Sequence, residues 1–187
     1  MANCKISRGS AFDCDAVVQA GIGDYMYLIN KDDFDNYQTL TEDGTTHNIT
    51  ALVLASGTQG YKFEAPKGSL QILATSTARQ QTANDGHDHS ITVYALDVTQ
   101  LSRENIDKLK YNKVVAIVPL KDGNFLLYGR YVGLRIDGEI TETPGDADVG
   151  GTIMFTVKTP ANDPPENALP HVIDSTFDIT SLDSPAA

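Results

Sequence analysis

His87 and His89 are the two residues whose spacing best matches a metal-binding arrangement. Side chains two positions apart in a strand point to one face, and the neutral imidazole is a common metal ligand. The sequence ANDGHDHS offers no obvious third ligand, and Asn84, Asp85 and Gly86 are typical of a turn. We therefore predict a turn at this stretch and no metal site.

Three aspartates, Asp32, Asp33 and Asp35, could supply the oxygen ligands that calcium prefers. A calcium loop also needs a glycine and a distal bidentate glutamate at fixed offsets. Glu42 and Gly44 stand at the wrong offsets for those two roles. The ligand count therefore argues against a calcium site.

No motif of a known catalytic chemistry is present in the chain. The nucleophile elbow G-x-S-x-G, the P-loop and the dinucleotide fingerprint are all missing. The four histidines lie in polar or proline-rich surroundings: His47, His87, His89 and His171. A carboxylate pair for glycoside hydrolysis remains an alternative, because it needs only two acids at the right separation in space. We expect no enzyme activity, no catalytic residue and no cofactor.

The stretch FLLYGRYVGLRI, residues 125–136, sets tyrosines and arginines among leucine, valine and glycine. Tyrosine buries its ring while its hydroxyl stays at a wet edge, so it is common at sheet rims and subunit interfaces. Cross-strand packing within one subunit is the plainer alternative. The residues that we expect between subunits are Tyr61, Phe63, Tyr128, Arg130, Tyr131 and Arg135.

The pattern of apolar residues predicts a mainly β fold, a β-sandwich or barrel with one short α-helix. The predicted strands are 24–30, 49–57, 61–65, the front half of 69–82, 89–98, 112–120, 125–140 and 152–159. The helix is expected over about 100–111, where Ile106 and Leu109 have helical spacing. SGTQG predicts a hairpin between the second and third strands, and the Asp-Gly of KDGN predicts a hairpin turn at 121–124.

The organisation along the chain is that of a single domain, 1–187, with irregular ends. We predict an N-terminal arm over 1–23, a β-sandwich body over 24–159 and an extended C-terminal arm over 160–187. Four prolines between 160 and 170 argue against a core strand in that last segment, because each removes a ladder donor. A polar, turn-rich stretch predicts a long loop over about 31–48.

Charge is distributed unevenly along a chain whose net charge is −11. Residues 1–50 and 137–187 are acidic, and the middle is mildly basic. This favours contacts between acidic arms and basic bodies of different copies, and uneven solvated loops are the alternative. Tight nucleic-acid binding is disfavoured, since it needs many Lys and Arg. The sequence has no apolar run of about 18 residues, so we predict no transmembrane helix. Cys4 and Cys14 are expected to be free thiols in the cytoplasm.

These features together resemble the tail tube proteins of tailed bacteriophages. The residues that carry the resemblance are the helix between ITVYALDV and VVAIVPLKDGNFLLYGRYVGLRI, the polar loop, the two arms and the closing GGTIMFTVKTPANDPPENALPHV. The resemblance covers most of the chain and is one of architecture, without an invariant motif or catalytic residue.

The resemblance implies a virion protein, assembled in the host cytoplasm, that forms stacked hexameric rings around a lumen. Its partners would be copies of itself, other tail proteins and DNA that passes without sticking, along a wall whose acidity repels phosphate. Two alternatives stay open: another β-rich virion component, such as a capsid decoration or head–tail joining protein, and a monomeric carbohydrate-binding β-sandwich.

Overall fold

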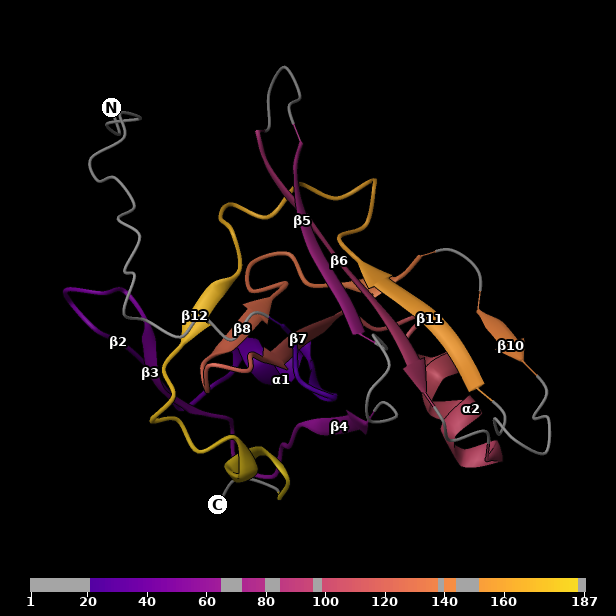
Figure 1. Cartoon of the computed structure of the whole chain (residues 1–187), viewed down its shortest axis with the longest axis horizontal. Coiled ribbons are helices and arrows are strands. Elements are labelled where there is room, and N and C mark those ends of the chain that lie inside the picture. The colour runs from indigo at the N-terminus through magenta and orange to yellow at the C-terminus, as the bar shows by residue number, and fades with distance from the viewer. Residues whose placement is uncertain are drawn as a thin grey trace.

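The computed structural model describes residues 21–64, 72–79, 85–95, 99–137, 140–143 and 152–184. These residues form two β-sheets with short helices beside them (Figure 1). The prediction of a mainly β fold is therefore confirmed. Among the described residues, no helix is both long and apolar enough to cross a lipid bilayer.

The larger sheet has seven strands, and most neighbours in it are antiparallel. Its strands in spatial order are β2 (Thr39–Glu42), β3 (Ile49–Val53), β12 (His171–Ile173), β8 (Phe125–Tyr128), β7 (Val114–Pro119), β1 (Tyr25–Asn30) and β4 (Tyr61–Glu64). The exception is β12, which runs parallel to β3. The predicted KDGN turn joins β7 to β8: Gly123 has a φ of +94°, and Leu120 N donates to Asn124 O at 2.8 Å.

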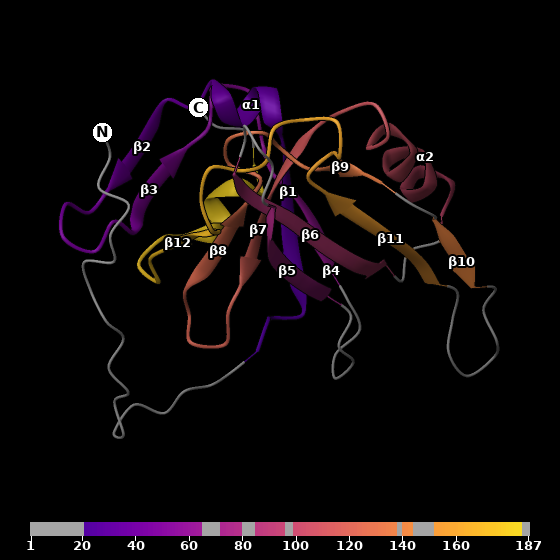
Figure 2. The same cartoon turned by 90° about the horizontal axis from the view of Figure 1, so that it is seen from above.

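The smaller sheet has five strands and lies over the larger one (Figure 2). Its strands in spatial order are β10 (Thr141–Thr143), β11 (Thr152–Lys158), β6 (Gly86–Ala95) and β5 (Ile72–Arg79), and β9 (Arg135–Ile136) also pairs with β11. The longest pairing joins β5 to β6 in an unbroken antiparallel register from Ile72↔Val93 to Arg79↔Gly86. The strands predicted over 89–98 and 152–159 form the middle of this sheet as β6 and β11, and β5 extends past the predicted front half of 69–82 to Arg79.

Three short helices accompany the sheets: α1 (Lys31–Asp35), α2 (Gln100–Lys108) and the 3-10 helix η1 (Ile179–Leu182). The predicted helix over 100–111 is confirmed as α2. Ile106 in this helix and Leu109 directly after it are buried, and Lys108 lies in the last turn, where a cation favours the helix dipole.

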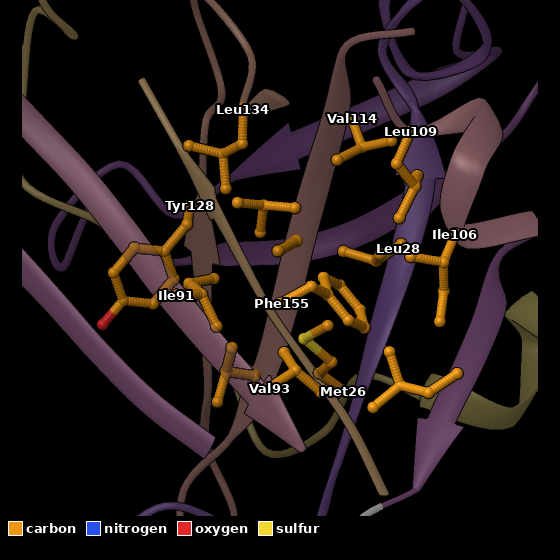
Figure 3. Packing of buried hydrophobic residues seen from close by; sticks show 14 residues of the cluster. Met26, Leu28, Ile91, Val93, Ile106, Leu109, Val114, Tyr128, Leu134 and Phe155 are labelled. Atoms are coloured by element: carbon orange, nitrogen blue, oxygen red, sulfur yellow. The ribbon is translucent and has the colours of Figure 1, made fainter. Parts of the chain in front are cut away.

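One hydrophobic core lies between the two sheets (Figure 3). The larger sheet contributes Met26 and Leu28, the smaller sheet contributes Ile91, Val93 and Phe155, and α2 closes one side. Alternation makes this possible, because every second residue of β6 and β11 points toward the larger sheet. The core therefore fixes which face of the smaller sheet is turned inward.

A second core covers the opposite face of the larger sheet. Tyr27 and Ile29 of β1 point into it, between the residues of β1 that enter the first core. Phe34 of α1 and Leu182 of η1 pack on these residues from outside. The larger sheet is consequently buried on both faces, which is why all six residues of β7, VVAIVP, are buried.

The prediction of a long loop over 31–48 is wrong. Lys31–Asp35 form α1, and Thr39–Glu42 form β2 at one edge of the larger sheet. Both segments are mostly polar, so the apolar pattern of the sequence did not indicate them. α1 buries only Lys31 and Phe34, and β2 is mostly exposed. The remaining loop between β2 and β3 is a turn in which Asp43 accepts hydrogen bonds from Thr45 and Thr46.

The prediction that 160–187 is an extended arm without a core strand is also wrong. The segment contains β12, which lies between β3 and β8 within the larger sheet. Ile173 is fully buried, and Phe177, Ile179 and Leu182 belong to the second core. The four prolines all precede β12, so they leave its ladder donors intact.

Two further local predictions fail. The predicted hairpin of 49–57 with 61–65 is wrong, because β3 and β4 are separated by four strands of the larger sheet. The predicted turn at ANDGHDHS is wrong from Gly86 onward, where β6 begins, and His89 is 2% exposed.

The predicted N-terminal arm over 1–23 lies outside the described residues, except for its last three. There, Gly23 N donates to Pro119 O at 2.7 Å, and Ile22 forms an antiparallel bridge with Leu120. Cys4 and Cys14 also lie outside the described part of the chain.

Candidate subunit interface

The edge of β5 is the longest sheet edge that the structure describes. The strand has the sequence ILATSTAR, eight residues without proline and with one charge, Arg79, at its end. Within the described residues, β5 pairs as a strand only with β6, and the side chain of Arg79 at its end also donates to Asp163 O. A long edge strand without charge or proline presents a row of unpaired backbone groups that another strand can join.

The other sheet edges that the structure describes are shorter. β2 has four residues and ends at Glu42, β10 has three residues, and β4 has four residues of which Lys62 and Glu64 are charged. Lys62 Nζ lies 2.6 Å from Glu64 Oε1, so the two charges form an ion pair on β4. Short and charged edges resist strand addition, so β5 is the described edge that is most open to strand addition.

The stretch 125–136 is a strand followed by a compact turn. β8 ends at Tyr128, and Gly129 and Gly133 both have positive φ, +75° and +84°. A Cβ on Gly129 would lie 2.8 Å from Leu134 Cγ, so the chain can fold back on itself only with glycine there.

Glu166 holds this turn from inside the molecule. The residue is 0% exposed, and its carboxylate accepts hydrogen bonds from Tyr131 N (2.9 Å), Val132 N (2.8 Å) and Gly133 N (3.1 Å). Its backbone also pairs with His87. Three backbone donors compensate a buried negative charge, so Glu166 ties the segment after β11 to the turn after β8.

His89 forms a second tie between the two sheets. Gly129 N donates to its Nδ1 at 3.1 Å, so its Nε2 carries the proton and donates to Ala168 O at 3.1 Å. Burial lowers the pKa of His89, which favours this neutral tautomer. Both nitrogens are therefore used within the subunit, and neither is available to a metal.

Residues proposed from the sequence as metal ligands do not gather. Within the described ranges, no group of three or more His, Cys, Asp or Glu side chains could hold a metal ion. Asp33 accepts a hydrogen bond from Asn30, and Asp35 forms an ion pair with Lys31.

The residues predicted between subunits separate into different places. Tyr61 is 49% exposed on β4, where Phe63 packs edge-on against Phe155 of the core at 5.9 Å. Tyr128 is 5% exposed and lies edge-on to His89, so its contacts are made within the subunit. Arg135 is exposed on β9.

Arg130 and Tyr131 do lie together, at one end of the molecule. Arg130 Nη2 is 2.6 Å from Glu42 Oε1, and its guanidinium lies 5.3 Å from the Tyr131 ring. Arg130 thereby holds the pKa of Glu42 below its usual range. Tyr131, 45% exposed, stands edge-on to His171 at 5.7 Å. This exposed cluster joins β2, β12 and the turn after β8.

A small groove lies between α2 and the β1–β4 side of the larger sheet. Its volume is about 230 Å³, and its lining includes Tyr61, Phe63, Asn30 and Asn112. That volume is below the roughly 300–1,000 Å³ of typical small-molecule sites.

Two features of this surface were missed from the sequence. The signal for the β5 edge was present, since ILATSTAR has a single charge and no proline. Glu166 gave no signal, because its three donors come from a turn more than thirty residues away.

Comparisons with protein-family models, curated proteins and solved structures found no match to this chain.

Proposed function

We propose that this chain is a virion structural protein whose copies join into stacked rings that form a phage tail tube, through which DNA passes. The observation that carries the proposal is the eight-residue edge of β5, which has no proline and one terminal charge. Such an edge in a soluble protein calls for a covering strand, and a second copy of the same chain supplies one.

Joining two different edges of the smaller sheet between neighbouring copies would give a ring instead of a closed dimer. β5 lies at one margin of the sheet, and β10 and β9 lie at the other margin, beyond β11. Joining the β5 margin of one copy to the opposite margin of the next is a heterologous contact, which repeats until the rotation closes it. The family resemblance implies six subunits in each ring.

The exposed cluster of Arg130, Tyr131, Glu42 and His171 supports contacts outside the sheet margins. Tyrosine and arginine are enriched in protein interfaces, and this pair lies on a turn that Glu166 makes rigid. A preorganised aromatic and cationic pair loses little conformational entropy on binding. We assign the cluster to contacts between subunits or with other tail proteins.

A carbohydrate-binding module is the second candidate, and the groove beside α2 is the observation in its favour. Tyr61 could stack on a sugar ring while Asn30 and Asn112 bind hydroxyl groups. This function predicts a stable monomer whose tyrosine fluorescence changes with glycans. Titration of the purified chain against a glycan set decides between the two candidates.

Assembly is tested with the full-length chain by light scattering and negative-stain electron microscopy, over a range of protein and salt concentrations and with preformed fragments as seeds. Tubes or rings are the expected result. Monomers or closed dimers under every condition would contradict the proposal.

Proline substitutions then test whether the β5 edge forms the contact between subunits. In an antiparallel pair, backbone N–H groups point alternately toward and away from the partner strand, so Thr77→Pro and Ala78→Pro differ in effect. One removes a bond to β6 and lowers the melting temperature. The other removes only a donor at the free edge, so it should leave the monomer folded and abolish assembly. Leu40→Pro and Thr41→Pro in β2 are the matched controls; the member of that pair that keeps the monomer stable should still assemble.

A further inference from the structure

A cleft lies between β9 and the segment that follows β11. Its volume is about 410 Å³, and it is lined by residues 135–137 on one side and 160–163 on the other. Figure 2 shows β9 beside the last part of β11, where Arg135 stands opposite Lys158. The volume falls within the roughly 300–1,000 Å³ of typical binding sites, so side chains of a partner can enter it.

Both carboxylates that line this cleft are already paired within the subunit. Lys158 Nζ lies 3.0 Å from Asp137 Oδ2, and Lys113 Nζ lies 2.7 Å from Asp163 Oδ2. Arg79 Nη1 also donates to the backbone oxygen of Asp163 at 2.9 Å, which holds this side of the cleft against β5. Neither aspartate therefore needs a cation from another molecule.

Arg135 is the cation at this cleft that has no carboxylate partner. Its side chain is exposed, and it forms no ion pair with any residue in the described part of the chain. Lys113 and Lys158 are each used by one aspartate, so the charge that remains at the cleft is that of Arg135. A guanidinium binds a carboxylate through two parallel hydrogen bonds, so the cleft suits a carboxylate from elsewhere.

An acidic segment of the chain begins at the opposite end of β11. Thr143 of β10 pairs with Thr152 of β11, and residues 144–151, with the sequence PGDADVGG, connect the two. This acidic segment contains Asp146 and Asp148 and no lysine or arginine, and it lies outside the described residues. β11 has seven residues, so its two ends are separated by about 20 Å.

We propose that the acidic segment 144–151 of one copy binds in the Arg135 cleft of another copy, where Asp146 or Asp148 pairs with the guanidinium. The inference rests on the proposed function and names a contact between copies away from the β5 edge. Because the segment and the cleft lie at opposite ends of one strand, the contact is heterologous and can repeat from copy to copy. Charge complementarity of this kind fixes which surfaces meet.

Charge reversal in the full-length chain tests this contact. Arg135→Glu places like charges together and should raise the protein concentration needed for half-maximal assembly by about tenfold or more. Asp146→Lys combined with Asp148→Lys should have the same effect from the other side of the contact. The control is Lys121→Glu, at an exposed lysine in the turn between β7 and β8, which changes the net charge equally and should assemble as the wild type does.

Mixing the two defective chains then shows whether the contact joins different copies. The cleft of the Arg135→Glu chain attracts the reversed segment of the other chain, and the unchanged cleft of that chain attracts the acidic segment of the first. Equal amounts of the two should therefore assemble together, although neither assembles alone. Light scattering measures assembly, and urea denaturation of each monomer confirms that the variants are folded.

Three results would overturn the inference: assembly of Arg135→Glu at the wild-type concentration, an equal loss in Lys121→Glu, or no recovery in the mixture. Recovery only when all three substitutions are in one chain would place the contact within a copy and would overturn it too. In each case the wild type still assembles, so the proposed function stands. Wild-type chains that never associate remove the proposed function and this contact with it.

Discussion

The two sheets of this protein differ in how completely the subunit finishes them. The seven-stranded sheet is covered on both faces, and its edge strands are short. Among the residues that the structure describes, the five-stranded sheet is covered on one face only and ends at β5, which is eight residues long with one charge. The first sheet is the framework of the subunit, and the second is the part that we propose other copies of the chain complete.

Two buried side chains connect the two sheets within the subunit. Glu166 and His89 both connect a segment beside the smaller sheet with the turn that follows β8 of the larger one. Because these ties are buried and specific, the position of the open sheet relative to the framework is fixed before any assembly.

The largest expected effect separates the inner and outer faces of the smaller sheet. Phe155→Ala removes a fully buried ring from the first core and should cost about 3–5 kcal/mol of unfolding free energy. The neighbouring Thr156→Ala, on the open face, should cost about 1 kcal/mol, the typical value of one hydrogen bond. Urea denaturation measures both. Equal losses would show that the outer face is not exposed as described.

The next effect tests the tie between the sheets. Glu166→Gln replaces a carboxylate that accepts three backbone hydrogen bonds with an amide that accepts fewer, and should cost about 2–3 kcal/mol. Glu42→Gln is the control, an exposed partner of Arg130 that should cost less than about 1 kcal/mol. If the two variants denature at the same urea concentration, Glu166 does not tie the sheets.

Acid should weaken the connection that His89 makes between the two sheets. The folded-state pKa of His89 lies below its value in the unfolded chain, so the unfolded chain binds the proton more readily. Stability is therefore fully present above about pH 6.5 and falls as the pH is lowered through the interval between the two pKa values. The pKa of His171 is lowered in the same direction, also mainly by burial.

Urea midpoints between about pH 7 and pH 5 measure this loss, in an interval above the usual pKa of carboxyl groups. His89→Gln should flatten the dependence, and His171→Asn should leave the share of His89 in place. A wild-type midpoint independent of pH over this range would refute the role of neutral His89.

The smallest effect concerns the cover of the larger sheet. Tyr27 donates from its hydroxyl to Asp183 Oδ1 at 2.5 Å, and burial with this partner raises the pKa of Tyr27. Tyr27→Phe should cost about 1 kcal/mol and loosen the C-terminal segment. Faster trimming by carboxypeptidase is the expected readout, with Tyr37→Phe as an exposed control. Trimming at the wild-type rate would mean that the hydrogen bond does not hold this segment.

Local elements were largely predictable from the sequence. β7 follows from a run of apolar residues, the turn after it from Asp-Gly, and α2 from helical spacing with a basic end. α1 and β2 were not predictable, because each buries few side chains. The position of α1 depends on the packing of its Phe34 in the second core, and the position of β2 depends on pairing with β3. A polar segment carries little information about which neighbour will cover it.

The sequence by itself determined that the chain is mainly β, where most strands run and which residues alternate toward a core. Tertiary structure alone decided that β12 lies beside β3 and β8, that β3 and β4 lie far apart, and that β5 ends a sheet. Backbone hydrogen bonds are the same for every pair of strands, so strand order is chosen by which side-chain faces pack best over long range. Whether an edge stays free is a result of that choice.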